Sequence, residues 1–134
     1  MEEQLKTALA KRALEIRKYV IEEVYSAQSG HPGGSLSIAD VVAYLYFHEL
    51  RVDPSRPDWE DRDRFVLSKG HCVPAVYAAL ALKGYFPTDW LKGFRHIDSL
   101  LQGHPNMLDV PGLDMSTGSL GQGISAACGM ALSA

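Results

Sequence analysis

The chain has 134 residues, of which 46% are hydrophobic, a profile typical of a globular protein long enough to bury a core without disulfides or a structural metal. Its formal net charge is -3 and it has no basic run, which argues against nucleic acid as the natural partner. No apolar run is long enough to cross a bilayer, and the acidic N-terminus is not that of a signal peptide, so neither membrane nor secretion is indicated.

The first third of the chain predicts two helices. Residues 3–27 have the 3.6-residue periodicity of an amphipathic helix. Its apolar face carries Leu5, Leu9, Ile16, Val20 and Val24. A second apolar helix is predicted to open near Ser37 and Asp40 and to continue through Leu50. The proline-rich segment 53–57 then predicts a loop.

A short apolar run, Phe65-Val66-Leu67, is the clearest strand signal in the sequence, and we expect it to be buried on both faces. A helix over residues 74–83, closed by Gly84, follows it. This order is typical of an α/β fold with a parallel sheet flanked by helices. Since such a sheet needs several strands, residues 1–134 are expected to be an incomplete domain, or to rely on another chain to complete the sheet.

The last third of the chain has weaker signals. A shorter helix is predicted after residues 87–89, and the residues from 98 to 118 have the composition of a loop. A final helix of small residues is expected over 122–134, and nothing in the sequence stops it at Ala134. No repeat or linker marks a domain boundary.

Three of the five histidines follow a glycine at a break in the chain. His31 lies in the turn Ser29–Ser35, which also holds three glycines and a proline, and His71 and His104 follow Gly70 and Gly103. Glycine permits a sharp bend or a close approach to a ligand, and an imidazole placed there can donate or accept a proton. A set of histidines at exposed bends therefore indicates a ligand site.

Each histidine also has a simpler interpretation. Alone, His31 fits a turn residue bonded to nearby backbone, and His104 fits a surface loop. His71 follows the predicted strand, whose carboxyl end is where ligands bind in open α/β sheets. His48 is interpreted as packing near Tyr44, and the role of His96 stays open.

The glycine-rich turn 117–123 precedes the last helix and has two interpretations. Free amides at a helix start bind phosphate oxygens, whereas glycines there also permit close helix packing. Cys72 and Cys128 fit no CxxC spacing and are interpreted as reduced, buried thiols of a cytoplasmic protein. A zinc site built from these cysteines and the histidines lacks the closely paired ligands of known sites, and no metal ligand is assigned.

Taken in order, these stretches resemble the N-terminal part of transketolase. The resemblance covers nearly the whole chain and is specific because four motifs occur in the family's order. They are Ser29–Gly34, Asp63–His71, Gln102–Pro105 and Ser116–Gly123. Lys69, and Leu101-Gln102 before Gly103, look most like the N-terminal subunit of transketolases that are split into two chains.

The resemblance implies a thiamine diphosphate-binding fold and transfer of a two-carbon ketol unit from a ketose phosphate to an aldose phosphate. It assigns His71 and the backbone of Gly118-Ser119-Leu120 to the diphosphate side of the cofactor. It assigns His31 and His104 to the reacting end of the substrate. Imidazoles suit this role, because they can donate to a developing oxyanion and accept a hydroxyl proton near neutral pH.

The resemblance also implies what lies outside residues 1–134. The family's Mg²⁺ ligands follow the last helix, and the glutamate that activates the aminopyrimidine belongs to a second domain. We therefore expect this chain to be inactive alone, to need a C-terminal partner subunit, and to work within an oligomer. The alternatives are a non-catalytic binding module and a related enzyme such as 1-deoxyxylulose-5-phosphate synthase, although Gly103-His104-Pro105 favours transketolase.

Overall fold

A computed structural model describes residues 2–134, which form helices joined by loops. The α-helices are α1 (Glu3–Ala27), α2 (Pro32–Tyr44), α3 (Val73–Lys83) and α4 (Gln122–Ser133). Shorter helical turns occur at η1 (Leu45–Glu49), η2 (Gly70–Cys72) and η3 (Thr88–Gly93). None of the helices in the described part of the chain combines the length and the apolar composition needed to span a membrane.

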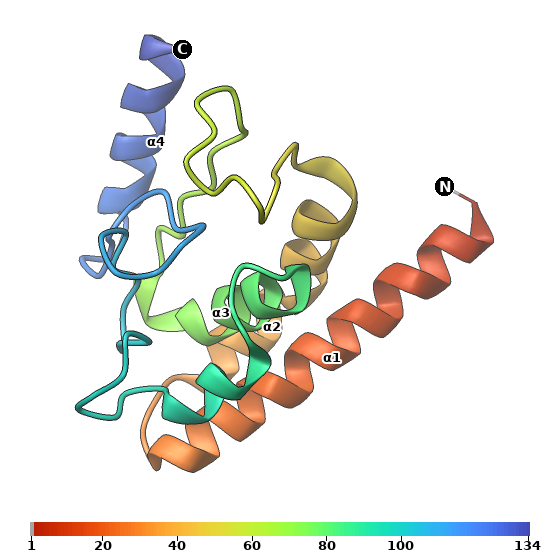
Figure 1. Cartoon of the computed structure of the whole chain (residues 1–134), viewed down its shortest axis with the longest axis vertical. Coiled ribbons are helices and arrows are strands. Elements are labelled where there is room, and N and C mark those ends of the chain that lie inside the picture. The colour runs from red at the N-terminus through yellow and green to blue at the C-terminus, as the bar shows by residue number, and fades with distance from the viewer. Residues whose placement is uncertain (1) are drawn as a thin grey trace.

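Helix α3 is the centre of the core, with α1 and α2 packed beside it (Figure 1). Every residue from 73 to 81 is buried, because this helix is apolar around its whole circumference. Its predicted end is confirmed: Gly84 adopts the left-handed conformation (φ +103°) and its N–H bonds the carbonyl of Leu80. Helix α3 thus forms a fixed base for the residues that precede and follow it.

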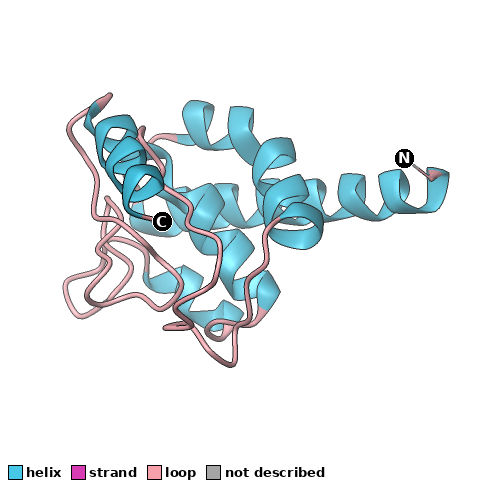
Figure 2. Ribbon diagram, turned by 90° about the horizontal axis from the view of Figure 1, so that it is seen from above, coloured by secondary structure: helices cyan, strands magenta, loops and turns pink. Residues whose placement is uncertain are grey.

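Helix α1 matches the predicted range 3–27. Ile16 and Val20 are fully buried on its inner face, whereas Leu5 and Leu9 are only half-buried. The reason is visible in Figures 1 and 2, where the N-terminal end of α1 projects beyond the other helices. The helix ends at Gln28, whose left-handed backbone (φ 49°) turns the chain toward the next helix.

Helix α2 begins at Pro32, earlier than the predicted start near Ser37. Proline suits the first turn of a helix, since its missing N–H would have no partner there. Gly34 fits inside the helix because the Sγ atom of Cys72 occupies the space where a side chain would lie. The helix also loosens into a π-turn at η1 before Leu50. His31 therefore stands directly before a helix rather than within a loop.

The predicted strand at residues 65–67 and the parallel sheet are not formed in residues 2–134, where no strand occurs (Figure 2). The segment is extended but has no neighbouring strand to pair with, and only Leu67 is buried. Side chains, rather than a neighbouring strand, bond the backbone groups of this segment. Asp114 accepts from the N–H of Phe65 at 2.8 Å, and the Thr117 hydroxyl donates to the Leu67 carbonyl at 2.7 Å.

The last third of the molecule follows the prediction in outline. A 3₁₀ turn, η3, follows residue 87, the residues from 98 to 118 form loops, and α4 begins at Gln122. Helix α4 stands apart from α1, α2 and α3 (Figure 1), and Gly123 is its one buried residue. The expectation of two buried thiols is therefore wrong for Cys128, which is exposed on α4, and right for Cys72.

Candidate active site

The first bend places His31 between α1 and α2. Gly30 has φ +141°, a conformation that L side chains rarely adopt, and a Cβ there would lie 3.0 Å from Val24 Cγ2. The Ser35 hydroxyl donates to the His31 carbonyl at 2.9 Å. The backbone at His31 is thus fixed from both sides, while its imidazole is exposed.

The second bend places His71 in η2, at the junction between the extended segment and α3. A Cβ on Gly70 would lie 2.7 Å from the Thr117 carbonyl oxygen, so glycine is required where these two backbones meet. Nδ1 of His71 is buried and has no hydrogen-bond partner among the described residues. A buried polar atom without a partner costs free energy, which is typical of an atom that a ligand satisfies.

The third bend places His104 over the middle of α3. The Tyr77 hydroxyl, which projects from the buried helix, lies 3.0 Å from the Gln102 carbonyl and 3.2 Å from the His104 carbonyl and donates to them. Pro105 is buried, which anchors the loop on its other side. The loop prediction is correct here, but His104 is held by α3 rather than lying on a free surface loop.

The three bends converge. The ring centroids of His31 and His71 are 5.0 Å apart, and those of His71 and His104 are 4.5 Å apart, both in edge-to-face geometry. A Cβ on Gly118 would lie 3.4 Å from Cδ2 of His104, so the glycine-rich turn borders the same group of rings. Segments far apart in the sequence thus form one cluster of imidazoles.

Electrostatics favour the neutral form of His104. The residue is exposed overall, but the neighbours of its ring partly desolvate it, and this burial lowers the pKa of His104 from its ordinary value. The charges of His71, Arg95 and His31 lower the same pKa further. A neutral imidazole at neutral pH can accept a proton from a hydroxyl group.

The turn before α4 offers free amides beside this cluster. The N–H groups of Gly118, Ser119 and Leu120 make no hydrogen bond within residues 2–134. The donors that follow are occupied, since Gly121 donates to the Ser68 carbonyl and Ile124 to the Ser68 hydroxyl. A hollow of about 260 Å³ lies along this turn. The packing interpretation of the turn is confirmed at Gly123, which lies close to Ser68. The amides of Gly118, Ser119 and Leu120 have no partner among the described residues, and phosphate binding by them stays a prediction.

Two basic residues near the cluster were missed as site residues. The Lys69 ammonium donates to the Gly34 carbonyl at 2.9 Å and to the Ser37 hydroxyl at 3.1 Å, which ties the His71 bend to α2. Arg95 contacts the bends that carry His31 and His104. The position of Lys69 directly before Gly70 was a sequence signal that it belongs near the site. No local pattern in the sequence marks Arg95.

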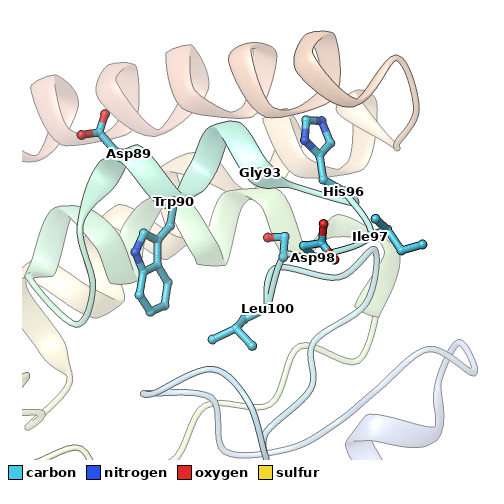
Figure 3. A pocket seen from close by; sticks show the side chains of 8 residues that line it. Asp89, Trp90, Gly93, His96, Ile97, Asp98 and Leu100 are labelled. Carbon is cyan, nitrogen blue, oxygen red and sulfur yellow. The ribbon is translucent and has the colours of Figure 1, made fainter.

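The other two histidines lie outside the cluster. The His48 ring packs edge-to-face on Tyr44 at 5.2 Å, in keeping with the packing interpretation, although His48 is exposed. His96 borders a cavity of about 760 Å³ next to η3, together with Trp90 and Leu100 (Figure 3). None of the predicted site residues lines that cavity. No group of three metal-ligating side chains occurs in the part of the chain that the structure describes.

The fold and these contacts define a helical protein in which clustered imidazoles lie beside amides without hydrogen-bond partners in the described chain. Comparison with known proteins gives the family. The family described as "Transketolase, thiamine diphosphate binding domain" matches residues 9–134, and the chain belongs to it.

Among curated relatives, the chain is 56% identical over 117 residues to the 6-deoxy-6-sulfo-D-fructose transketolase subunit of Clostridium sp. (strain MSTE9), covering 87% of this chain and 42% of that protein. It is 46% identical over 118 residues to an apulose-4-phosphate transketolase subunit of Phocaeicola vulgatus, covering 88% of this chain and 42% of that protein. The chain thus spans 42% of the length of these two relatives.

Solved structures agree with the family assignment. A transketolase from Leishmania mexicana superposes with a TM-score of 0.88 at 42% identity, over 92% of this chain and 19% of that one. A transketolase from Campylobacter jejuni superposes with a TM-score of 0.86 at 37% identity, over 98% of this chain and 20% of that one. The helical arrangement described above is therefore the transketolase fold over this part of the chain.

Proposed function

We propose that this chain provides the diphosphate half of a thiamine diphosphate site in a transketolase. The observation that carries the proposal is the convergence of His31, His71 and His104 beside the free amides of the turn at Gly118. The reaction is the transfer of a two-carbon ketol unit between sugar phosphates. Residues 1–134 form the N-terminal part of the domain, and the Mg²⁺ ligands follow it in sequence.

The residues fit the diphosphate of the cofactor. Nδ1 of His71 is buried without a partner, and the amides of Gly118, Ser119 and Leu120 are unused donors in the turn that borders the neighbouring His104 ring. Amides at the start of a helix bind phosphate oxygens, because the peptide dipoles favour negative charge there. We assign these four residues to the diphosphate. The Mg²⁺ that accompanies it is held by residues outside this chain.

His31 and His104 act on protons at the reacting end of the substrate. The bound cofactor supplies the electron sink for cleavage of a carbon–carbon bond, so no protein nucleophile is needed. The neutral ring of His104 accepts the proton of a substrate hydroxyl, since its pKa is lowered by burial and by the neighbouring positive charges. The exposed ring of His31 donates to the substrate oxygen on which negative charge develops.

The site is completed by a partner. Two of the relatives above are named as transketolase subunits, which supports a C-terminal subunit that binds the aminopyrimidine side of the cofactor. We propose an oligomeric, cytoplasmic enzyme of pentose phosphate metabolism. A transketolase from Pichia stipitis has been solved with sedoheptulose-7-phosphate, which supports sugar phosphates as substrates.

The test measures cofactor binding and turnover separately. A form of the chain extended through the Mg²⁺ ligands is mixed with the C-terminal subunit, and thiamine diphosphate is titrated calorimetrically in the presence of Mg²⁺. We expect His71→Ala to weaken binding by at least about tenfold, the loss of roughly one charge-assisted hydrogen bond. His31→Ala should leave affinity within about twofold and lower turnover by about 10²–10⁴-fold.

His48, an exposed histidine outside the cluster, gives the matched control. His48→Ala should change neither affinity nor turnover. Absence of binding heat in the unsubstituted complex, with or without Mg²⁺, would show a non-catalytic module instead. Equal loss of affinity in His31→Ala and His71→Ala would refute the division of roles.

A further inference from the structure

Arg95 occupies an unusual position in the chain. It is one of two non-glycine residues between 2 and 134 with positive φ, at 61°. Its backbone N–H donates to the Leu101 carbonyl at 2.8 Å, closing the loop that leads to His104. A left-handed backbone is unfavourable for an L residue with a long side chain, and it persists only where surrounding contacts fix it. The side chain shows what those contacts are.

The guanidinium of Arg95 connects two of the histidine bends. Its Nη1 donates to the Ser29 hydroxyl at 2.7 Å, and Ser29 lies two residues before His31. On the other side it lies against the backbone of Gly103, the residue directly before His104. A Cβ on Gly103 would lie 2.6 Å from Nε and 2.9 Å from Cζ, so glycine is needed for this contact.

The positive charge of Arg95 is held in a sheltered place. Nε is buried and has no hydrogen-bond partner among residues 2–134, and Cζ lies 5.6 Å from the centre of the Phe94 ring. A hollow of about 570 Å³ next to the guanidinium reaches His104. Arginine stays protonated at all relevant pH values, so a full positive charge always borders that hollow.

The groups around the His104 ring come from four parts of the fold. They are His31 from the bend before α2, His71 from η2, Arg95 from the loop after η3, and Tyr77 from α3 through the His104 carbonyl. Arg95 differs from the two histidines because its charge is permanent. The lowered pKa of His104 is consistent with this environment, with burial the largest cause and His71 the next.

We propose that Arg95 is a positioning residue: it holds the bends of His31 and His104 at a fixed spacing and keeps a permanent positive charge beside the His104 imidazole. The inference rests on the proposed function for the role of His104 as a base. It adds a residue that belongs to none of the four motifs. Arg95 thereby adds to the effects of burial and His71, which favour the neutral form of His104 that accepts a proton.

The direct test is an NMR titration of the chain labelled at histidine, with the His104 resonance assigned by comparison with His104→Gln. In Arg95→Met the permanent charge is lost, so the pKa of His104 should rise, with about a threefold lower proton dissociation constant. Arg95→Lys should keep the wild-type pKa more closely, because the charge is retained. Arg51→Met, which removes an exposed arginine of another loop, is the matched control and should leave the titration unchanged.

Ser29→Ala tests positioning without changing any charge. It removes the hydroxyl that anchors Nη1, so we expect displaced resonances of both His31 and His104 with a smaller change in pKa. This variant and Arg95→Lys keep the inference testable if Arg95→Met does not fold. An unchanged His104 titration in a folded Arg95→Met, or unchanged His31 and His104 resonances in Ser29→Ala, would overturn the proposal.

The complete enzyme gives a second readout. In Arg95→Met the acid limb of the kcat/KM profile should move to higher pH, following the His104 base, and Arg95→Lys should restore part of the shift. A merely structural role would lower the amount of active enzyme without moving the profile. If the unsubstituted complex fails to bind thiamine diphosphate, the proposed function fails, whereas the effect of Arg95 on the His104 titration stands or falls independently.

Discussion

The frame of α1, α2 and α3 and the segment from residue 98 to 133 are built differently. In the frame, apolar side chains pack against each other, and α3 is buried from residue 73 to 81. The later segment consists of loops and an exposed helix, and it contributes only a few side chains, such as Leu101 and Val110, to that core. Single polar contacts through Asp114, Thr117 and Ser68 join it to the stretch that leads from residue 62 to His71 at the start of α3. Two of the clustered histidines belong to the frame, and His104 and Gly118 belong to the later segment.

This difference shows where the site is robust and where it is vulnerable. Burial of apolar area is non-directional and tolerates small changes, whereas a buried polar contact is lost entirely when one partner is removed. The candidate site lies along the boundary between the two regions. Substitutions at the polar contacts should therefore affect the site more than conservative substitutions in the helical core.

The largest effect is expected at Asp114, which is 7% exposed and binds Arg62 at 2.7 Å and the N–H of Phe65 at 2.8 Å. Asp114→Ala leaves the Arg62 guanidinium partly buried without its partner, so we expect a loss of about 3–5 kcal/mol in the free energy of unfolding. Urea denaturation followed by circular dichroism measures it. Asp109→Ala, at an exposed position of the same segment, should stay within about 0.5 kcal/mol; equal losses in both variants would contradict the assigned role.

The next effect concerns the contact between the two backbones. In Gly70→Ala the new Cβ meets the Thr117 carbonyl oxygen, so the later segment must move away from the frame, at a cost of about 2–3 kcal/mol. Cofactor affinity in the assembled enzyme should fall as well, because His71 and Gly118 separate. Gly33→Ala is the control: a Cβ there meets nothing within 4 Å, so thermal unfolding should show no loss of stability. Unchanged binding in Gly70→Ala would argue against the close approach.

Replacing a buried acid in the frame should raise the stability of the protein, whereas the two substitutions above lower it. Glu23 on α1 is fully buried, and neither carboxylate oxygen has a hydrogen-bond partner within the described chain. Burial, with a contribution from Glu22, raises the pKa of Glu23 well above its ordinary value. We expect Glu23→Leu to stabilise the protein by about 1–2 kcal/mol at pH 8, because it removes a polar group that nothing compensates.

The pH dependence of that gain follows from the raised pKa. Below the ordinary pKa of a glutamate, about 4.5, Glu23 is protonated in both the folded and the unfolded chain. As the pH rises above this value, the unfolded chain ionises while the folded chain retains its proton, so the unsubstituted protein loses stability. The advantage of Glu23→Leu should therefore grow as the pH rises above about 4.5 in urea titrations. A gain independent of pH would show that Glu23 is not the titrating group. Glu22→Leu, at an exposed position, should give only a small part of the gain, because Glu22 is the lesser cause of the raised pKa of Glu23.

The two regions also differ in how far the sequence predicts them. The apolar periodicity suffices to predict α1, because local spacing decides which face of a helix is buried. The stop glycine, Gly84, suffices to predict where α3 ends. The segment 65–67 was predicted as a strand since its composition suits one, but a strand also needs a partner, and residues 2–134 provide none. The start of α2 was predicted too late, because glycine is a poor helix former and the segment holds Gly33 and Gly34. The presence of Gly34 inside the helix is explained only by its contact with Cys72, which the sequence does not show.

The candidate site shows the same limit. The glycine–histidine pattern singles out His31, His71 and His104 in the sequence, and the structure brings them together, while their roles stay predictions. Arg95 and Glu23 have no such signal. One is an ordinary basic residue of a loop and the other lies beside the polar face of an amphipathic helix, and their burial depends on elements that pack against them from elsewhere in the chain.

The smallest effect should be local to α4. The Ser68 hydroxyl accepts from the N–H of Ile124 in the first turn of that helix, which no side chain of its own caps. Ser68→Ala should cost about 1 kcal/mol, a usual value for a lost helix cap. Since α4 has few other contacts, the cost should appear as faster amide hydrogen exchange in residues 122–133, with α3 unchanged. Ser125→Ala, on the exposed side of α4, should alter neither; uniform acceleration across α3 and α4 would mean that the frame and the later segment unfold as one unit.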